Sequence, residues 1–101
     1  MNAPGGTVAG AVGPVLVADQ LGRAVADAIR LRNPGALVTD RGAYLRVSCS
    51  DECTLSASDV EASTGAPFSL PLDLERVMPS FSGNLSLASG VATWTRKKTR
   101  S

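Results

Sequence analysis

The strongest constraint on the fold of this chain is one amphipathic helix with a clear start and a clear stop. Between Gln20 and about Leu31, apolar residues recur at the i, i+4, i+7, i+8 spacing that places them on one helical face. Asp19 supplies the side-chain oxygen that an N-cap needs. Asn33-Pro34-Gly35 ends the helix, because proline cannot donate the next helical hydrogen bond. The predicted buried stripe consists of Leu21, Val25, Ala28 and Ile29.

The segments on either side of this helix have the pattern of short strands. Residues 12–17 form a β-branched apolar run, in which Pro14 predicts an edge strand or a strand paired on one side only. Residues 37–39 and 43–49 predict two strands joined through Asp40-Arg41-Gly42, and residues 53–55 predict a short returning strand. In residues 43–49, alternation places one set of side chains inward, Ala43, Leu45, Val47 and Cys49, and another outward, Tyr44, Arg46 and Ser48.

The second half of the chain predicts two short helices and a hairpin. Ser58-Asp59-Val60-Glu61 has the pattern of a capping box, for a helix that runs to about Ser63 and is ended by Gly65. Pro71 predicts the first turn of a second helix, which Pro79 terminates. Residues 81–87 and 91–94 predict two strands about a Ser89-Gly90 turn.

These elements predict a single compact domain of the α+β class. The expected order is β-α-β-β-(β)-α-α-β-β, with short mixed or antiparallel sheets packed against helices. We expect a flexible Gly/Ala-rich tail at residues 1–11, the domain at residues 12–95 and a basic tail at residues 96–101. Apolar residues make up 44% of the chain but aromatic ones only 4%, which predicts a thin aliphatic core.

The residue types argue against chemistry performed by this chain itself. The chain contains no histidine, so the usual general base and the commonest nitrogen ligand for a metal are absent. Its two cysteines, Cys49 and Cys53, are too few for a structural zinc site, and without a secretory signal we expect reduced cytosolic thiols. A disulfide, or half of an intermolecular metal site, is the alternative. An enzyme that uses paired carboxylates remains open, although Asp51, Glu52, Asp73 and Glu75 are expected to be solvated.

Charge and hydropathy limit the possible partners. Residues 1–95 hold six arginines against nine carboxylates, a balance of −3, whereas residues 96–101 add +4. A basic tail without interleaved aromatic residues makes nucleic acid an unlikely partner and is typical of a solvated tail. The first 18 residues are uncharged, but prolines and glycines interrupt them, so we expect no membrane span, no signal peptide and a cytoplasmic location.

Five short motifs in fixed order carry a resemblance to a known family. They are Val12-Gly13-Pro14-Val15, Asn33-Pro34-Gly35, Asp40-Arg41-Gly42-Ala43-Tyr44-Leu45-Arg46-Val47, Gly65-Ala66-Pro67-Phe68 and Ser80-Phe81-Ser82-Gly83. Each motif alone is weak. At these spacings, from about Val12 to Trp94, the chain resembles the effector (coupling) proteins of soluble diiron monooxygenases, nearest to those of the four-component toluene and alkene monooxygenases.

The resemblance implies a regulatory protein that performs no redox step and holds no cofactor. Its partner would be a hydroxylase that houses the diiron centre, in a system with a reductase and a Rieske ferredoxin. The effector would tune oxygen activation, coupling and substrate access by preferring one hydroxylase conformation. The alternative is a small stand-alone module that binds a ligand or nucleic acid, for which the basic tail is the only support.

The same resemblance, together with the outward side chains, predicts a hydroxylase interface. Tyr44 and Arg46 are an aromatic residue and an arginine side by side on one strand face, a pair that is enriched at interface hot spots and is otherwise an ordinary half-exposed sheet face. Phe81 is expected in the core, and Trp94 is expected to anchor the sheet. The predicted interface residues are Gly13, Pro14, Asn33, Pro34, Gly35, Arg41, Tyr44, Arg46, Ser80, Phe81 and Gly83.

Overall fold

The helix that begins after Asp19 is the frame of the structure, a computed structural model that describes residues 11–96. It spans Gln20–Arg32 as α1, and the Asp19 carboxylate accepts a hydrogen bond of 2.7 Å from the Gly22 amide, as the N-cap prediction requires. Its buried face contains Val25, Ala28 and Ile29, with Gly22 and Ala26 in addition, whereas Leu21 is only half-buried.

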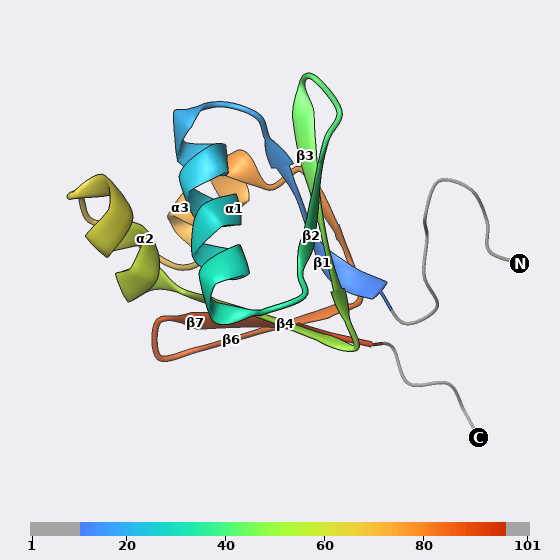
Figure 1. Ribbon diagram of the computed structural model, residues 1–101. Helices are drawn as coiled ribbons and strands as arrows, with labels where there is room; N and C mark the ends of the chain where they lie inside the picture. Colours follow the sequence, from blue (N-terminus) through green and yellow to red (C-terminus); the bar gives the residue numbers. More distant parts are fainter. Residues whose placement is uncertain (1–10, 97–101) are drawn as a thin grey trace, which may run out of the picture.

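Two antiparallel sheets and two further helices complete the described domain (Figure 1). The first sheet has four strands in the order β2-β3-β1-β5, and the second has three in the order β4-β7-β6. This α+β architecture and its element order confirm the predicted fold class. The remaining elements are β1 (Ala11–Val17), β2 (Leu37–Asp40), β3 (Tyr44–Ser50), β4 (Glu52–Ser56), α2 (Ala57–Thr64), α3 (Leu72–Val77), β5 (Ser80–Ser82), β6 (Asn84–Ala88) and β7 (Val91–Thr95).

All three described helices lie on the same side of the first sheet, and the second sheet lies across the end of α1 that leads into β2 (Figure 1). The core fills the space between these layers. It is mainly aliphatic, as predicted, with Phe68 and Trp94 as its aromatic members. Trp94 on β7 is fully buried, which places it as the predicted sheet anchor. Within residues 11–96, no helix covers the other face of the first sheet.

The position of β1 corrects one prediction. Pro14 suggested an edge strand, but β1 lies inside the first sheet and pairs with both β3 and β5. The pairing with β3 is interrupted at Gly13 and Pro14, so the missing proline N–H does not break a ladder there. Gly13 has φ 143°, and a Cβ at this position would lie 2.4 Å from the Val47 carbonyl oxygen.

The predicted strand of residues 81–87 is in fact two strands in different sheets. β5 pairs with β1 in the first sheet, whereas β6 pairs with β7 in the second. Gly83 lies between them with φ 98°, and a Cβ there would lie 2.6 Å from the Thr95 carbonyl oxygen and 2.8 Å from Val12 Cγ1. The chain therefore changes sheet at a glycine because no side chain fits there. The predicted Ser89-Gly90 hairpin turn is confirmed, with φ values of 49° and 77°.

Two smaller predictions also fail. Ser58 is not an N-cap, because α2 already begins at Ala57, and Ser56 precedes it without a side-chain capping bond. The Glu61 carboxylate instead accepts a hydrogen bond of 2.9 Å from the Phe68 amide, so it fixes the chain beyond Gly65. Ala43, predicted to point inward, is exposed and lies outside β3.

The side chain of Asn33 joins α1 to the second sheet. Its amide nitrogen donates to the carbonyl oxygens of Ile29 and Thr54, each at 2.7 Å, and its oxygen accepts from the Thr54 amide at 3.0 Å. Thr54 belongs to β4, whose other edge pairs with β7. One side chain thus caps the helix and satisfies an exposed strand edge.

A bidentate ion pair strengthens the same corner of the domain. Arg32, the last residue of α1, donates to both carboxylate oxygens of Asp59 on α2, at 2.6 and 3.0 Å. These hydrogen bonds lower the pKa of Asp59 and raise that of Arg32. The C-terminal end of α1 is therefore attached to both β4 and α2.

We expect Asn33→Ala to lower the free energy of unfolding by about 1–3 kcal/mol, because the Thr54 amide and carbonyl lose their partner. Asn84→Ala is the matched control: Asn84 is exposed at the start of β6, and we expect a change within ~0.5 kcal/mol. Urea unfolding followed by the fluorescence of Trp94, the single tryptophan, measures both. Equal unfolding midpoints for the two variants would contradict a structural role for Asn33.

Candidate docking surface

The uncovered face of the first sheet, here called the outer face, follows from the alternation of side chains along β3. Leu45, Val47 and Cys49 are buried beneath α1, whereas Tyr44 and Arg46 are exposed on the opposite side. This division confirms the predicted inward and outward sets for the residues within β3. Tyr44 keeps 46% of its surface exposed. The outer face therefore presents an aromatic residue and an arginine on one strand.

Strand register brings residues from distant parts of the chain into one row on this face. Arg46 on β3 lies opposite Thr39 on β2 and opposite Val15 on β1, and Val15 lies opposite Ser80 on β5. In antiparallel sheets, directly opposed residues point to the same side. The row therefore runs across all four strands of the sheet, with Arg46 near its middle.

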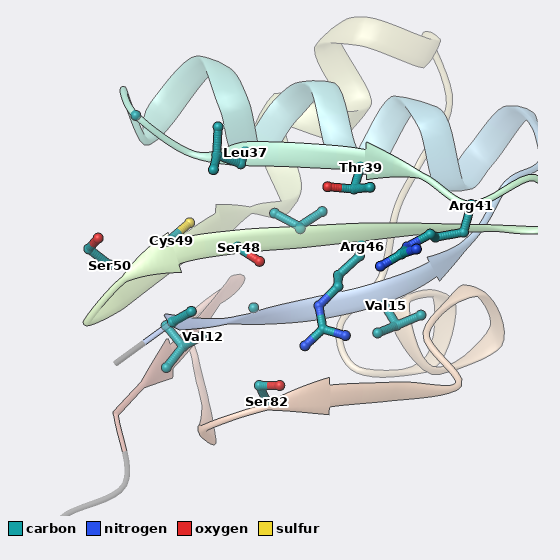
Figure 2. A pocket seen from close by; sticks show the side chains of 14 residues that line it. Val12, Val15, Leu37, Thr39, Arg41, Arg46, Ser48, Cys49, Ser50 and Ser82 are labelled. Atoms are coloured by element: carbon teal, nitrogen blue, oxygen red, sulfur yellow. The ribbon is translucent and has the colours of Figure 1, made fainter. Parts of the chain in front are cut away.

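A shallow hollow of about 210 Å³ occupies the outer face (Figure 2). Arg41 enters it from the β2–β3 turn, and the Arg46 guanidinium reaches over β1 toward β5, between Val12 and Val15 in this view. The rest of the lining is small and neutral: Ala11, Gly13, Gly35, Leu37, Thr39, Val47, Ser48, Cys49, Ser50 and Ser82.

All the charged side chains that line the hollow are positive. Its lining contains two arginines and no carboxylate. Within residues 11–96, the ion pairs at or below 4.0 Å join Arg23 to Asp40, Arg32 to Asp59, Arg76 to Asp73 and Arg96 to Asp51, and none involves Arg41 or Arg46. A body of net −3 thus concentrates unpaired positive charge on one sheet face. Such a face favours partners that present carboxylates.

The predicted interface residues do not all lie on the outer face. Arg41, Tyr44, Arg46 and Ser80 do, and the backbone at Gly13 and Gly35 lines the hollow. Pro14 is buried among the core residues. Asn33 is committed to internal hydrogen bonds, while Pro34 beside it is exposed.

The segment Ser80-Phe81-Ser82-Gly83 also divides between surfaces. Phe81 was expected in the core, but it keeps 42% of its surface exposed. Phe81 lies opposite buried Pro14, so its side chain faces the helix side. It stays partly exposed because its strand, β5, is the edge strand of the sheet. Gly83 packs against Val12 at the change of sheet.

Ten lining residues are not among the predicted interface residues: Ala11, Val12, Val15, Leu37, Thr39, Val47, Ser48, Cys49, Ser50 and Ser82. The alternation in residues 37–39 indicates that Leu37 and Thr39 share a face, and Ser48 was already placed outward. Ser82 had no such local signal, because only the pairing of Gly13 with Ser82 brings β5 to this face.

The described residues contain neither a cluster of metal ligands nor a membrane-spanning helix. Residues 11–96 contain no group of three or more His, Cys, Asp or Glu side chains that could hold a metal ion. In the same range, no helix is long and apolar enough to span a membrane. Of the predicted tails at residues 1–11 and 96–101, residues 1–10 and 97–101 lie outside the described residues. Ala11 begins β1, and Arg96 pairs with Asp51 at 3.1 Å.

Fold and surface together define a small α+β domain with two unpaired arginines on one sheet face. Residues 10–95 match the model of the MmoB/DmpM family, and the chain belongs to this family. It is 36% identical over 88 residues to the alkene monooxygenase system effector subunit of Xanthobacter autotrophicus (strain ATCC BAA-1158 / Py2), which covers 85% of this chain and 86% of that protein. The chain is thus a monooxygenase effector, a regulatory rather than a catalytic component, as the motif resemblance indicated.

Two solved structures share the fold. Both come from complexes of a phenol hydroxylase with its regulatory protein. One superimposes with a TM-score of 0.75 at 16% identity over 84% of this chain and 95% of that chain. The other gives 0.73 at 19% identity over 84% and 98%, respectively. At this identity the likeness concerns the fold alone.

The two faces of β3 predict opposite consequences of substitution. Leu45→Ala removes a buried side chain that is 3% exposed and should lower the free energy of unfolding by about 2–5 kcal/mol through cavity formation. Tyr44→Ala, on the outer face, should change it by only ~0.5 kcal/mol. Chemical denaturation curves of both variants and the parent measure this. A larger loss for Tyr44→Ala than for Leu45→Ala would mean that the faces are inverted.

Proposed function

We propose that this protein binds the diiron hydroxylase of a multicomponent alkene or aromatic monooxygenase and tunes oxygen activation, coupling and substrate access. The observation that carries this proposal is the outer face, with its unpaired Arg41 and Arg46, in a chain of the MmoB/DmpM family. The effector name of the Xanthobacter relative and the hydroxylase complexes of the structural neighbours support it.

The outer face is suited to docking by its rigidity and its charge. Arg46 lies on a strand that pairs on both sides, with β1 and with β2, so its backbone is fixed before any partner arrives. A preorganised side chain loses less conformational freedom on binding. Arginine also forms two parallel hydrogen bonds to a carboxylate, which fixes the geometry of the contact. Tyr44 adds a large surface beside it.

Regulation by such a protein works through differential binding. An effector shifts a hydroxylase only by the difference between its affinities for two hydroxylase conformations. By holding helices near the diiron centre in one arrangement, it changes how oxygen is activated and how NADH consumption is coupled to product. The binding energy comes from the surface contacts of the effector, so the effector needs no reactive group.

In this proposal the redox chemistry resides entirely in the partners. The diiron centre belongs to the hydroxylase, and a reductase and a Rieske ferredoxin deliver the electrons. The effector contributes neither a metal ligand nor a cofactor-binding residue. The neutral hydroxyl groups of Thr39, Ser48 and Ser82 around the two arginines are available for hydrogen bonds to a protein surface.

We expect Arg46→Ala to weaken hydroxylase binding by roughly 1–2 kcal/mol, about 5- to 30-fold. The concentration of effector that gives half-maximal stimulation should rise by this factor, whereas the maximal rate should be retained. Arg30→Ala is the matched control, because Arg30 is an exposed arginine on α1, on the helix-covered side of the molecule. Titration of the cognate hydroxylase with each variant, with product and NADH measured together, gives both quantities.

Equal weakening by Arg46→Ala and Arg30→Ala would rule out the outer face as the docking surface. If the unsubstituted protein changed neither the rate nor the coupling of the hydroxylase, the proposed function itself would fail. Added salt should weaken the parent complex more than the Arg46→Ala complex, because the substitution removes one of the charges that salt screens.

A further inference from the structure

The turn that joins the two sheets carries a pair of buried thiols. Cys49 is the last core residue of β3 and Cys53 is the first of β4, separated by the turn at Ser50-Asp51-Glu52. Cys49 is 5% exposed and Cys53 is fully buried, and both belong to the core. Both are free thiols. Asp51 turns the chain with φ 66°, so the two thiols lie on the core side of one tight bend.

The two thiols contact each other and are not equivalent. The neighbouring Cys53 thiol stabilises negative charge on Cys49, which lowers the pKa of Cys49. The interaction with Cys49, together with burial, raises the pKa of Cys53. The arrangement makes Cys49 the better nucleophile of the pair.

Cys49 is the less enclosed of the two cysteines, with 5% of its surface exposed against none for Cys53. It borders a hollow of about 200 Å³ beside Asn33, Pro34 and Glu52. Cys53 lines neither this hollow nor that of the outer face, and a Cβ added at Gly13 would lie 3.7 Å from its sulfur, so backbone packs against it. A small oxidant in this hollow is therefore nearer to Cys49 than to Cys53.

We propose that Cys49 and Cys53 form a peroxide-reactive dithiol, in which Cys49 is oxidised first and Cys53 resolves it to an intramolecular disulfide. The Cys49 thiolate attacks one oxygen of a hydroperoxide, the O–O bond breaks, and a sulfenic acid forms as the second oxygen leaves and is protonated. The Cys53 sulfur then attacks the Cys49 sulfur, an S–S bond forms, and the hydroxyl group leaves as water with the Cys53 proton. With hydrogen peroxide, two thiols and one oxidant give one disulfide and two waters.

This disulfide would connect β3 of the first sheet to β4 of the second. The site is adjacent to the hollow of the outer face, because Cys49 is among the residues of that hollow. Dithiothreitol should reverse the reaction, since a disulfide is reducible whereas sulfinic and sulfonic acids are not.

The test uses the unsubstituted protein and hydrogen peroxide. After oxidation the intact protein should lose the mass of two hydrogen atoms, and thiol counting in denaturant should fall from two free cysteines to none. Cleavage after Glu52 separates Cys49 from Cys53 in the sequence. The two fragments on either side of this cut should therefore remain joined until dithiothreitol is added. Unchanged free thiols, a disulfide between two copies of the chain, or direct conversion to sulfinic acid would overturn the proposal.

Single substitutions test the order of events. In Cys53→Ser, peroxide should leave a sulfenic acid on Cys49 that dimedone traps, whereas Cys49→Ser should give at most a tenth of that labelling because Cys53 is enclosed. Far-UV circular dichroism confirms that each variant is folded before labelling. Equal labelling of the two variants would overturn the assigned roles, and the fragment mapping of the unsubstituted protein tests the disulfide even if a variant does not fold.

Discussion

The position of α1 over both sheets depends on the side-chain amide of Asn33. Its hydrogen bonds to Ile29 and Thr54 end the helix and occupy the open edge of β4 with the same group. A partly buried amide that lost these partners would leave several backbone groups unsatisfied, so the arrangement tolerates little displacement. The Arg32–Asp59 pair then attaches α2 to the same helix end. Because these contacts hold α1 on one side of the first sheet, no helix of residues 11–96 covers the opposite side.

The change of sheet by the chain also depends on close backbone contacts. Gly83 carries the chain from β5 to β6 where a Cβ would strike Thr95 and Val12, and Gly13 lets β1 approach Val47. These two glycines lie side by side in space, since Gly13 pairs with Ser82. Of the two, Gly13 lines the outer hollow, where it contributes backbone and no side chain.

Local signals in the sequence predicted the elements well, and the failures have a common cause. Asp19, the stripe around Val25, the alternation in β3 and the Ser89-Gly90 turn act within a few residues, and the structure contains all of them. The edge-strand prediction from Pro14 was wrong because the sheet accommodates this proline through an interrupted pairing with β3, a strand more than 30 residues away in sequence. The residues around Gly83 have the pattern of one continuous strand. The change of sheet at Gly83 follows only from the pairing of β5 with β1 and of β6 with β7. Of the docking surface, alternation predicted that Tyr44 and Arg46 point outward. The contribution of Ser82 could not be predicted, because it depends on register between β1 and β5.

An effector that supplies no reactive group acts only through the contacts that it makes. In this fold, the unpaired charges of Arg41 and Arg46 lie on backbone that is already fixed. Exposed arginines on loops lose much side-chain and backbone freedom when they are immobilised. Arg46 lies on an interior strand, whose backbone is already fixed by β1 on one side and β2 on the other. Arg41 lies on the turn that this strand begins from, where the Arg41 amide donates to the Tyr44 carbonyl at 2.7 Å. The backbone of both residues is thus fixed by hydrogen bonds, while neither guanidinium group pairs with a carboxylate in residues 11–96. Positive charge left unpaired on a rigid frame stabilises the unbound protein little, but it is available in full to a partner.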